Sequence, residues 1–429
     1  MRMRRTGTAL AAGVLAGAVA LAPGMAQAAV SSVPAATPQL ATSGTDGSVE
    51  QVRQIVQCGD TMYAVGRFTA VKNPRSSTAI ARRNAFAFSA ASPYRVTGWN
   101  PNVNGQVNTA ACAPDGNILL GGSFSSAGGA ANANMARVNP TTGAALPWAY
   151  HPSKQVEHVE VVAGHALVGG YFPGYLNSVS PTTGIDDGYG TPAISGNYQF
   201  PGVRPNPTRV WNMSVSPDGT AVLVSGDFTS VGGAHHEQLF RLNLTPGAAT
   251  VSAWTPTELF SDCATVEPFY AQDAAWSLDM NTVYVATTGY KPYNLSKSVP
   301  RSGPCDAAIA YPATETTFSG HAWINYTGCD SLYSVAADDS TVFVAGHQRW
   351  INNPRGCDNE GPGARPQTGL GEIDPVTGLA QTGPNRGRGL GADDLLRTAD
   401  GLWIASDNLA NTAMCAGQSG HMGICFLPD

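Results

Sequence analysis

Acidic and amide side chains recur at similar distances before a series of short apolar segments in this sequence. They are Asn108, Glu157, Asn212, Asp273, Asp330 and Asp393. If the segments that follow them line one axis, these oxygen-bearing groups converge there and could hold Ca²⁺, which takes about 6 to 8 oxygen ligands. Polar side chains also line water-filled channels that hold no ion, and we favour that interpretation. Calcium is therefore a possible cofactor, and the sequence indicates no other.

A second set of residues that could bind a ligand lies in three segments that are longer than their counterparts elsewhere, at 255–273, 289–304 and 347–368. These segments combine aromatic rings with amide and charged groups, a mixture that suits a sugar or peptide ligand. We expect any ligand site to be centred on Tyr290, Tyr293, His347, Arg349, Trp350 and Asp358. The alternative is that the rings only cap strand edges and the charges are solvated.

No known catalytic motif accompanies these two sets. The sequence contains no nucleophile elbow, phosphate-binding loop, dinucleotide fingerprint or zinc-protease helix. His235 and His236 are the only adjacent histidines, and neighbouring loop residues rarely bind one metal together. The segment Gly417-Gln418-Ser419-Gly420-His421 looks like a serine site but lacks the spacing of a serine nucleophile. We therefore assign no catalytic residue.

The eight cysteines indicate disulfide bonds, because their number is even and no two have the close spacing of a zinc or thiol-redox site. Eight cysteines allow roughly a hundred pairings, and spacing alone does not choose among them. We expect sequence neighbours to pair: Cys58 with Cys112, Cys263 with Cys305, Cys329 with Cys357, and Cys415 with Cys425.

A repeated unit must position these residues. A short apolar strand recurs along the whole chain, as Met62-Tyr63-Ala64, Ile118-Leu119-Leu120, Ala166-Leu167-Val168, Val222-Leu223-Val224, Val283-Tyr284-Val285, Val342-Phe343-Val344 and Leu402-Trp403-Ile404. The chain has 49 glycines and 30 prolines, which supply turns and disfavour helices. Seven such units, about 50 to 60 residues apart, predict an all-β fold, a seven-bladed β-propeller.

Each unit can be divided into four strands, with tight turns such as Pro114-Asp115-Gly116 between the first two. The last unit lacks a fourth strand, because few residues follow Trp403. We predict that the segment from Pro38 to Gly47 supplies the missing outer strand and closes the ring. The expected organisation is a signal peptide at 1–28, a closing segment at 29–48 and the propeller at 49–429.

Several segments also carry a family resemblance. Gly226-Asp227-Phe228-Thr229-Ser230-Val231-Gly232-Gly233, Gly122-Ser123-Phe124-Ser125-Ser126-Ala127-Gly128-Gly129 and Gly66-Arg67-Phe68-Thr69-Ala70-Val71 are similar to the delta-60 repeat of secreted bacterial β-propeller proteins. The tryptophans of Trp99-Asn100-Pro101 and Trp254-Thr255-Pro256 extend the match. It is strong in the first, second and fourth units, partial in the third and weak in the last three. The resemblance implies a propeller fold and export, and it implies no reaction.

The first residues predict export. Arginines precede an apolar run from Ala9 to Leu21, and Ala26-Gln27-Ala28 follows as a cleavage site. Arg4-Arg5 leaves a twin-arginine route open, but the bulky apolar residues expected after it are missing. The apolar run is shorter than the roughly 20 residues that a membrane span needs. A net charge of −6 gives no electrostatic reason to expect nucleic acid.

Two functions from different classes fit these features. The leading expectation is a secreted, non-enzymatic binding module for an extracellular glycan, peptide or protein, acting through the long loops. The alternative is a calcium-dependent hydrolase or lyase acting at the mouth of the central channel. Binding needs only a complementary surface, whereas catalysis needs a base or nucleophile within reach of a polarised group. The absence of such a motif favours the binding module.

Overall fold

The computed structural model describes residues 30–41, 49–199, 202–260, 263, 266–290, 303–314, 318–383, 391–407, 415 and 422–429. The predicted signal peptide and Tyr293 lie outside these residues. Within them the chain is an all-β propeller with one short 3₁₀ helix, η1 (Thr257–Leu259). None of the described helices is long and apolar enough to cross a membrane.

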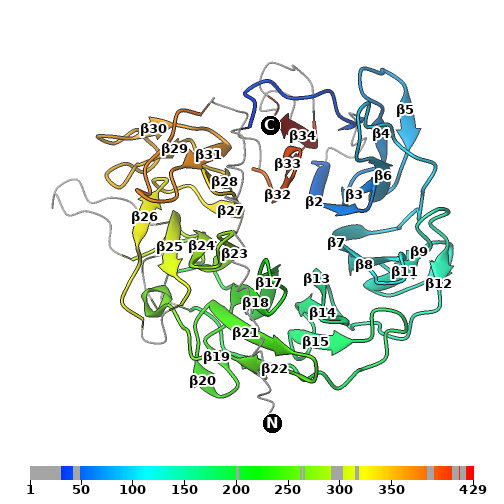
Figure 1. Ribbon diagram of the computed structural model, residues 1–429, viewed down its shortest axis with the longest axis horizontal. Coiled ribbons are helices and arrows are strands. Elements are labelled where there is room, and N and C mark those ends of the chain that lie inside the picture. Colours follow the sequence, from blue (N-terminus) through cyan, green and yellow to red (C-terminus); the bar gives the residue numbers. More distant parts are fainter. Residues whose placement is uncertain are drawn as a thin grey trace, which may run out of the picture.

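Seven main antiparallel sheets of three or four strands follow one another around a common centre (Figure 1). The first three are β2 (Gln51–Cys58), β3 (Thr61–Arg67) and β6 (Ala85–Ser89); β7 (Gln106–Cys112), β8 (Ile118–Ser123), β11 (Met135–Val138) and β12 (Ala145–Leu146); and β13 (Val156–Val162), β14 (His165–Gly170) and β15 (Leu176–Val179).

The other four main sheets are β17 (Arg209–Val215), β18 (Ala221–Asp227), β21 (Leu239–Thr245) and β22 (Ala248–Val251); β23 (Ala271–Trp276), β24 (Thr282–Thr287), β25 (Ala307–Pro312) and β26 (Trp323–Tyr326); β27 (Leu332–Ala337), β28 (Val342–Gly346) and β31 (Leu370–Ile373); and β32 (Asp394–Thr398), β33 (Gly401–Ala405) and β34 (Ile424–Pro428). Smaller pairings involve β1 (Gln39–Leu40), β4 (Ala70–Lys72), β5 (Ala79–Ala81), β9 (Ser126–Ala127), β10 (Ala130–Ala131), β16 (Ile194–Ser195), β19 (Ser230–Val231), β20 (Ala234–His235), β29 (Trp350–Ile351) and β30 (Arg365–Pro366).

The predicted apolar triplets are confirmed as strands. Each lies in the second strand of its main sheet, and those strands are buried almost throughout because neighbouring sheets pack on both of their faces. The expected tight turn between the first two strands also forms. Gly116 occupies it with a φ of 80°, a conformation that residues with a side chain rarely adopt.

Tryptophans from the ends of the sheets join neighbouring sheets. The indole N–H of Trp99 donates to the carbonyl of Asn139 at 2.9 Å, and Trp254 and Trp323 donate to Pro312 and Pro375 at 2.8 Å each. Each acceptor lies at or just after the end of the third strand of the next main sheet, with Pro312 the last residue of β25. The packing between sheets is apolar, and the hydrophobic clusters draw on residues of adjacent sheets. Burial between sheets therefore supplies the core.

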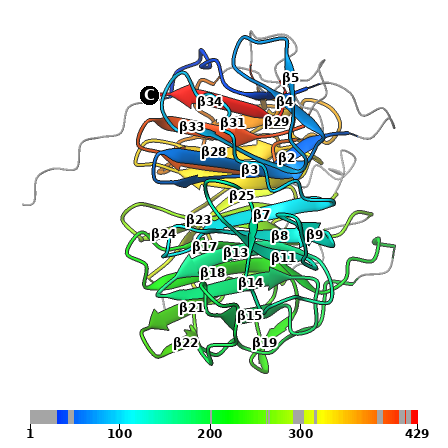
Figure 2. The ribbon, with the colours of Figure 1, turned by 90° about the vertical axis from the view of Figure 1, so that its right-hand side faces the viewer.

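The first strands of the main sheets contact one another in chain order: β2 with β7, β7 with β13, β13 with β17, β17 with β23, β23 with β27 and β27 with β32. β32 also contacts β2. Figure 2 accordingly shows β33 and β34 of the last sheet close to β2 and β3 of the first. The beginning and the end of the propeller lie side by side.

The N-terminal segment runs antiparallel along β34. The backbone N–H groups of Ser31, Ala35 and Leu40 donate to the carbonyls of Pro428, Phe426 and Met422 at 2.6, 2.9 and 3.0 Å. Leu40 is fully buried. The contacts begin before the predicted segment from Pro38 to Gly47, and residues 42–48 lie outside the described part of the chain.

All four expected disulfides are present: Cys58–Cys112, Cys263–Cys305, Cys329–Cys357 and Cys415–Cys425. The choice of sequence neighbours is confirmed. Cys58 and Cys112 end the first strands of two adjacent sheets, so that this bridge joins the sheets directly.

Candidate functional site

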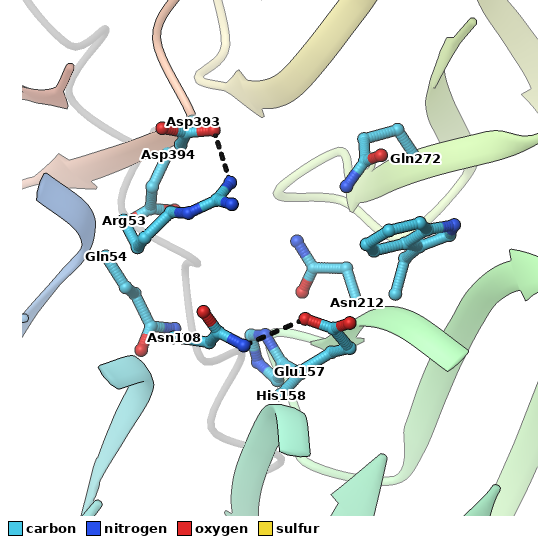
Figure 3. A pocket seen from close by; sticks show the side chains of 10 residues that line it. Arg53, Gln54, Asn108, Glu157, His158, Asn212, Gln272, Asp393 and Asp394 are labelled. Atoms are coloured by element: carbon cyan, nitrogen blue, oxygen red, sulfur yellow. Dashed lines mark hydrogen bonds and ion pairs between the residues drawn. The ribbon is translucent and has the colours of Figure 1, made fainter. Parts of the chain in front are cut away.

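A β-bulge near the start of the inner strand in six of the seven main sheets shapes the central channel. In the first six main sheets the ladder skips one residue of the inner strand, as it does at Arg53, Asn108 and Glu157. A bulge bends the strand and re-aims the side chains beside it. The skipped residue and its successor therefore both reach the channel, as with Arg53 and Gln54 or Glu157 and His158. They surround a polar cavity of about 70 Å³ (Figure 3).

One layer of these channel residues hydrogen bonds from sheet to sheet. A side-chain oxygen accepts the backbone N–H of the next inner strand in four places: Gln54 from Ala110 at 2.7 Å, Thr109 from Val159 at 3.1 Å, Asp273 from Val335 at 2.9 Å and Asp394 from Ile55 at 2.9 Å. We call Gln54, Thr109, Asp273 and Asp394 the inter-sheet ring. The last of these bonds connects the final main sheet with the first.

The skipped residues form a second layer, in which side chains pair with side chains. Arg53 and Asp393 form an ion pair at 2.9 Å, and the amide of Asn108 donates to Glu157 at 2.9 Å (Figure 3). Glu157 also forms an ion pair with Arg209 at 3.0 Å. Opposite charges thus meet within the channel, which reduces the cost of burying them.

Burial dominates the electrostatics of the channel carboxyls. It raises the pKa of Asp273 to about 7 and the pKa of Asp394 to about 6. Burial also raises the pKa of Asp393 to about 6, although the positive charge of Arg53 acts in the opposite direction. The pKa of Glu157 is raised for the same reason, against the effect of Arg209.

Five of the six residues considered for calcium lie along this channel, namely Asn108, Glu157, Asn212, Asp273 and Asp393. Asp330 does not, because it lies two residues before β27, the strand in which the bulge skips Tyr333. Its carboxylate instead receives two hydrogen bonds from the guanidinium of Arg349, each at 2.9 Å, and one from the backbone N–H of Arg349 at 3.2 Å. Among the described residues, no three His, Cys, Asp or Glu side chains are grouped so as to hold a metal ion.

The long loops bring four of the predicted ligand residues together. Arg349 pairs with Asp358 at 2.6 Å, and the hydroxyl of Tyr290 donates to Asp358 at 3.1 Å. The guanidinium of Arg349 also lies 4.9 Å from the ring centre of Trp350. We call Tyr290, Arg349, Trp350 and Asp358, with Asp330, the enlarged-loop cluster.

His347, the remaining predicted residue within the described chain, is half-buried beside the enlarged-loop cluster, and its backbone N–H donates to the carbonyl of Ser331 at 2.9 Å. The Cys329–Cys357 disulfide joins the segments that carry Asp330 and Asp358. The enlarged-loop cluster is therefore braced by a covalent link as well as by ion pairs.

Sequence reasoning missed a third group, which lies at the rim of the channel. Lys154 Nζ lies 4.4 Å from the ring centre of Tyr171, and Arg209 Cζ lies 4.9 Å from the same ring and 4.4 Å from that of Trp211. Trp211 in turn stacks on Tyr270, with ring centres 5.3 Å apart and an interplanar angle of 20°. We call these five residues the cation–aromatic stack. They come from separate segments, and the only sequence signal was the position of Trp211 directly before Asn212.

A match to a family model supports the β-propeller fold. A family model described as a domain of unknown function (DUF5122) beta-propeller matches residues 113–144. No protein of curated function matches the sequence.

Three solved structures illustrate what the chain is similar to. The extracellular domain of BT4673 from B. thetaiotaomicron is 10% identical over 91% of this chain, with a TM-score of 0.46, and this chain spans 39% of its length. BamB from Moraxella catarrhalis is 12% identical over 89% of this chain and all of its own, with a TM-score of 0.45. The WD40 beta propeller domain of Doa1 is 10% identical over 91% of this chain and 97% of its own, with a TM-score of 0.42.

Proposed function

We propose that this protein is a secreted, non-enzymatic binding module whose ligand site is the enlarged-loop cluster. The observation that carries the proposal is the joint position of Tyr290, Arg349, Trp350 and Asp358 beside the Cys329–Cys357 disulfide. Export is supported by the four disulfides, which persist in oxidising compartments outside the cytoplasm.

The cluster combines a fixed guanidinium with accessible partners. The buried side chain of Asp330, which is 3% exposed, forms an ion pair with Arg349 at 2.9 Å. The side chain of Asp358, the other partner of Arg349, is 64% exposed. A ligand can therefore compete for Asp358 and reach the half-buried ring of Trp350 without disturbing the buried ion pair. Side chains that are already held lose less conformational entropy on binding. An extracellular glycan, peptide or protein with both polar groups and an apolar face would suit this surface.

The scaffold that we propose is a seven-bladed propeller of the delta-60 type, closed by residues 29–48. Closure is supported by the hydrogen bonds of Ser31 and Ala35 with β34 and of Leu40 with Met422 just before it, and by the bond from Ile55 to Asp394 between the first and last main sheets. Such pairing covers an edge strand that would otherwise be open to association with other chains.

The calcium-dependent enzyme is the weaker hypothesis. Both oxygens of Asp273 already accept hydrogen bonds, from the amide of Asn212 at 2.8 Å and from the backbone of Val335 at 2.9 Å. Asn108 and Glu157 bond to each other, and Glu157 also pairs with Arg209. A cation at the channel mouth would have to replace these bonds, and no observation favours that exchange.

A glycan array and a peptide array, probed with the mature protein, would identify a ligand. Arg349→Ala and Trp350→Ala should then weaken binding by about tenfold or more while the melting temperature stays nearly unchanged. Arg137→Ala is the matched control, because Arg137 also pairs with an aspartate, Asp115, but at a turn on the opposite face. If neither variant changes the affinity while Asp273→Asn abolishes it, the ligand binds at the channel mouth and the proposal fails.

A further inference from the structure

We propose a second ligand site, for an acidic oligosaccharide, in the pocket beside the cation–aromatic stack. The pocket has a volume of about 410 Å³ and lies between the third and fourth main sheets, on the outer side of Tyr171. It is separate from the enlarged-loop cluster, which belongs to the fifth and sixth main sheets. Its size is that of pockets that take small ligands, roughly 300 to 1,000 Å³.

The charge of the pocket favours an anion. Lys154 and Arg209 both approach the ring of Tyr171, at 4.4 and 4.9 Å. Arg209 is paired with Glu157 at 3.0 Å, whereas no carboxylate of the described residues lies within ion-pairing distance of Lys154. The exposed ammonium therefore leaves one positive charge without a counter-charge, in a protein whose net charge is −6. A carboxylate on a ligand could supply it.

The polar groups of the pocket suit hydroxyl-rich ligands. Among the described residues, the hydroxyls of Tyr171 and Tyr175, which both line the pocket, make no hydrogen bond to the protein. The amide of Asn197 uses its nitrogen to bond the carbonyl of Asn206 at 2.7 Å, which leaves its oxygen as an acceptor. The hydroxyl of Thr208 donates to Gly196 at 2.5 Å and can still accept. These groups together can donate to and accept from several sugar hydroxyls.

The apolar part of the lining matches the C–H faces of sugar rings rather than a deep peptide anchor. Pro173 and Pro207 are exposed, and Tyr175 is half-buried. Ring faces of sugars pack on such accessible aromatic and proline surfaces without entering a core. A peptide side chain would need a deeper apolar pocket to gain comparable energy.

The stack also links this pocket with the channel. Tyr171 lines the pocket, Trp211 lines the channel cavity, and Arg209 lies between the two rings. Because Glu157 holds Arg209 in place, the stack is fixed before a ligand arrives. A sugar chain seated in the pocket can therefore extend along the rim towards the channel mouth.

Calorimetric titration of the mature protein with galacturonic acid tetrasaccharide tests the proposal. The fully methyl-esterified tetrasaccharide is the matched neutral probe, and a tetraglutamate peptide represents the other class of acidic ligand. We expect saturable binding of the acidic sugar, about tenfold weaker binding of the ester, and weaker binding still of the peptide. No saturable binding of either sugar, or tighter binding of the peptide, would overturn the proposal.

Variants locate the binding. Tyr171→Ala should weaken binding of the acidic sugar by about tenfold, and Lys154→Gln by about fivefold, with little effect of Lys154→Gln on the ester. Lys72→Gln is the control for a lysine elsewhere, and Arg349→Ala, in the enlarged-loop cluster, should leave this binding unchanged. If Tyr171→Ala lowers the melting temperature, Tyr171→Phe, which removes only the hydroxyl, takes its place. Affinity that is unchanged in both Lys154→Gln and the Tyr171 variant would exclude this pocket.

Discussion

The inter-sheet ring and the enlarged-loop cluster use similar polar side chains for different ends. In the ring, the oxygens of residues such as Thr109 and Asp273, which are 0% and 7% exposed, accept backbone N–H groups of the next sheet. In the cluster, Arg349 and Asp358 bond mainly to other side chains, and Asp358 is largely exposed. Polar groups bonded to buried backbone stabilise the fold, whereas exposed side-chain pairs remain available to a ligand. Burial and the type of partner, rather than composition, separate the two.

The largest effect should come from removing the segment that lies against the last sheet. Deleting residues 29–48 removes the bonds of Ser31 and Ala35 to β34 and of Leu40 to Met422, and leaves the site of the fully buried Leu40 empty. We expect a loss of more than about 3 kcal/mol in the free energy of unfolding, which urea denaturation measures. A protein that begins at residue 29 is the reference. An unchanged melting temperature would show that the segment is a free tail and that the ring needs no closing strand.

A matched pair of threonine substitutions compares the two regions directly. Thr109→Val keeps the shape of the side chain but leaves the backbone N–H of Val159 without its acceptor, and should cost about 2 kcal/mol. Thr368→Val, beside the enlarged-loop cluster, removes a hydroxyl that donates to the carbonyl of Arg349 at 3.3 Å in a half-buried position. That change should cost less than about 0.5 kcal/mol. Equal losses for the two variants, measured by urea denaturation, would remove the distinction between the ring and the cluster.

A pH dependence of stability should also arise in the ring. Burial raises the pKa of Asp273 to about 7 and of Asp394 to about 6. In the unfolded chain these carboxyls titrate near about 3.9. Between the two values the folded protein holds protons that the unfolded chain has released, so the free energy of unfolding falls as pH rises from about 4 to 7.

Melting temperatures between pH 5 and pH 8 measure this fall. The difference should shrink in Asp273→Asn, whatever the absolute stability of the variant, because one of the two titrating groups is gone. Asp358→Asn changes an exposed carboxyl of the cluster and should leave the difference as it is. A pH dependence that is the same in all three proteins would show that Asp273 does not contribute to it.

Repetition explains why much of the architecture could be predicted from sequence. The apolar triplets identified the second strands because both faces of those strands are covered by neighbouring sheets, which leaves a continuous hydrophobic run. The disulfides followed from proximity in sequence, since Cys58 and Cys112 end equivalent strands of adjacent sheets. Local pattern and overall fold agree at these positions.

The register of the inner strands could not be predicted. A bulge moves every later side chain by one position, and nothing in the composition of the strands marks it. Asp330 was placed by its distance from Val342-Phe343-Val344, whereas the bulge brings Tyr333 and Ser334 to the place expected for it. The cation–aromatic stack was missed because it depends on the proximity of Tyr171, Trp211 and Tyr270, which lie in or beside strands of three different main sheets.

The antiparallel course of the N-terminal segment has a mechanical consequence. Ser31 bonds to Pro428 and Leu40 to Met422, so residues 30 and 429 lie at the same end of these two paired segments. Tension applied between those two residues would load the hydrogen bonds one after another, as in opening a zipper, rather than all at once in shear. The segment would then peel away at low force, starting from Ser31, while the seven main sheets stayed folded. A propeller tethered and pulled in this way would open at this edge before any main sheet unfolded.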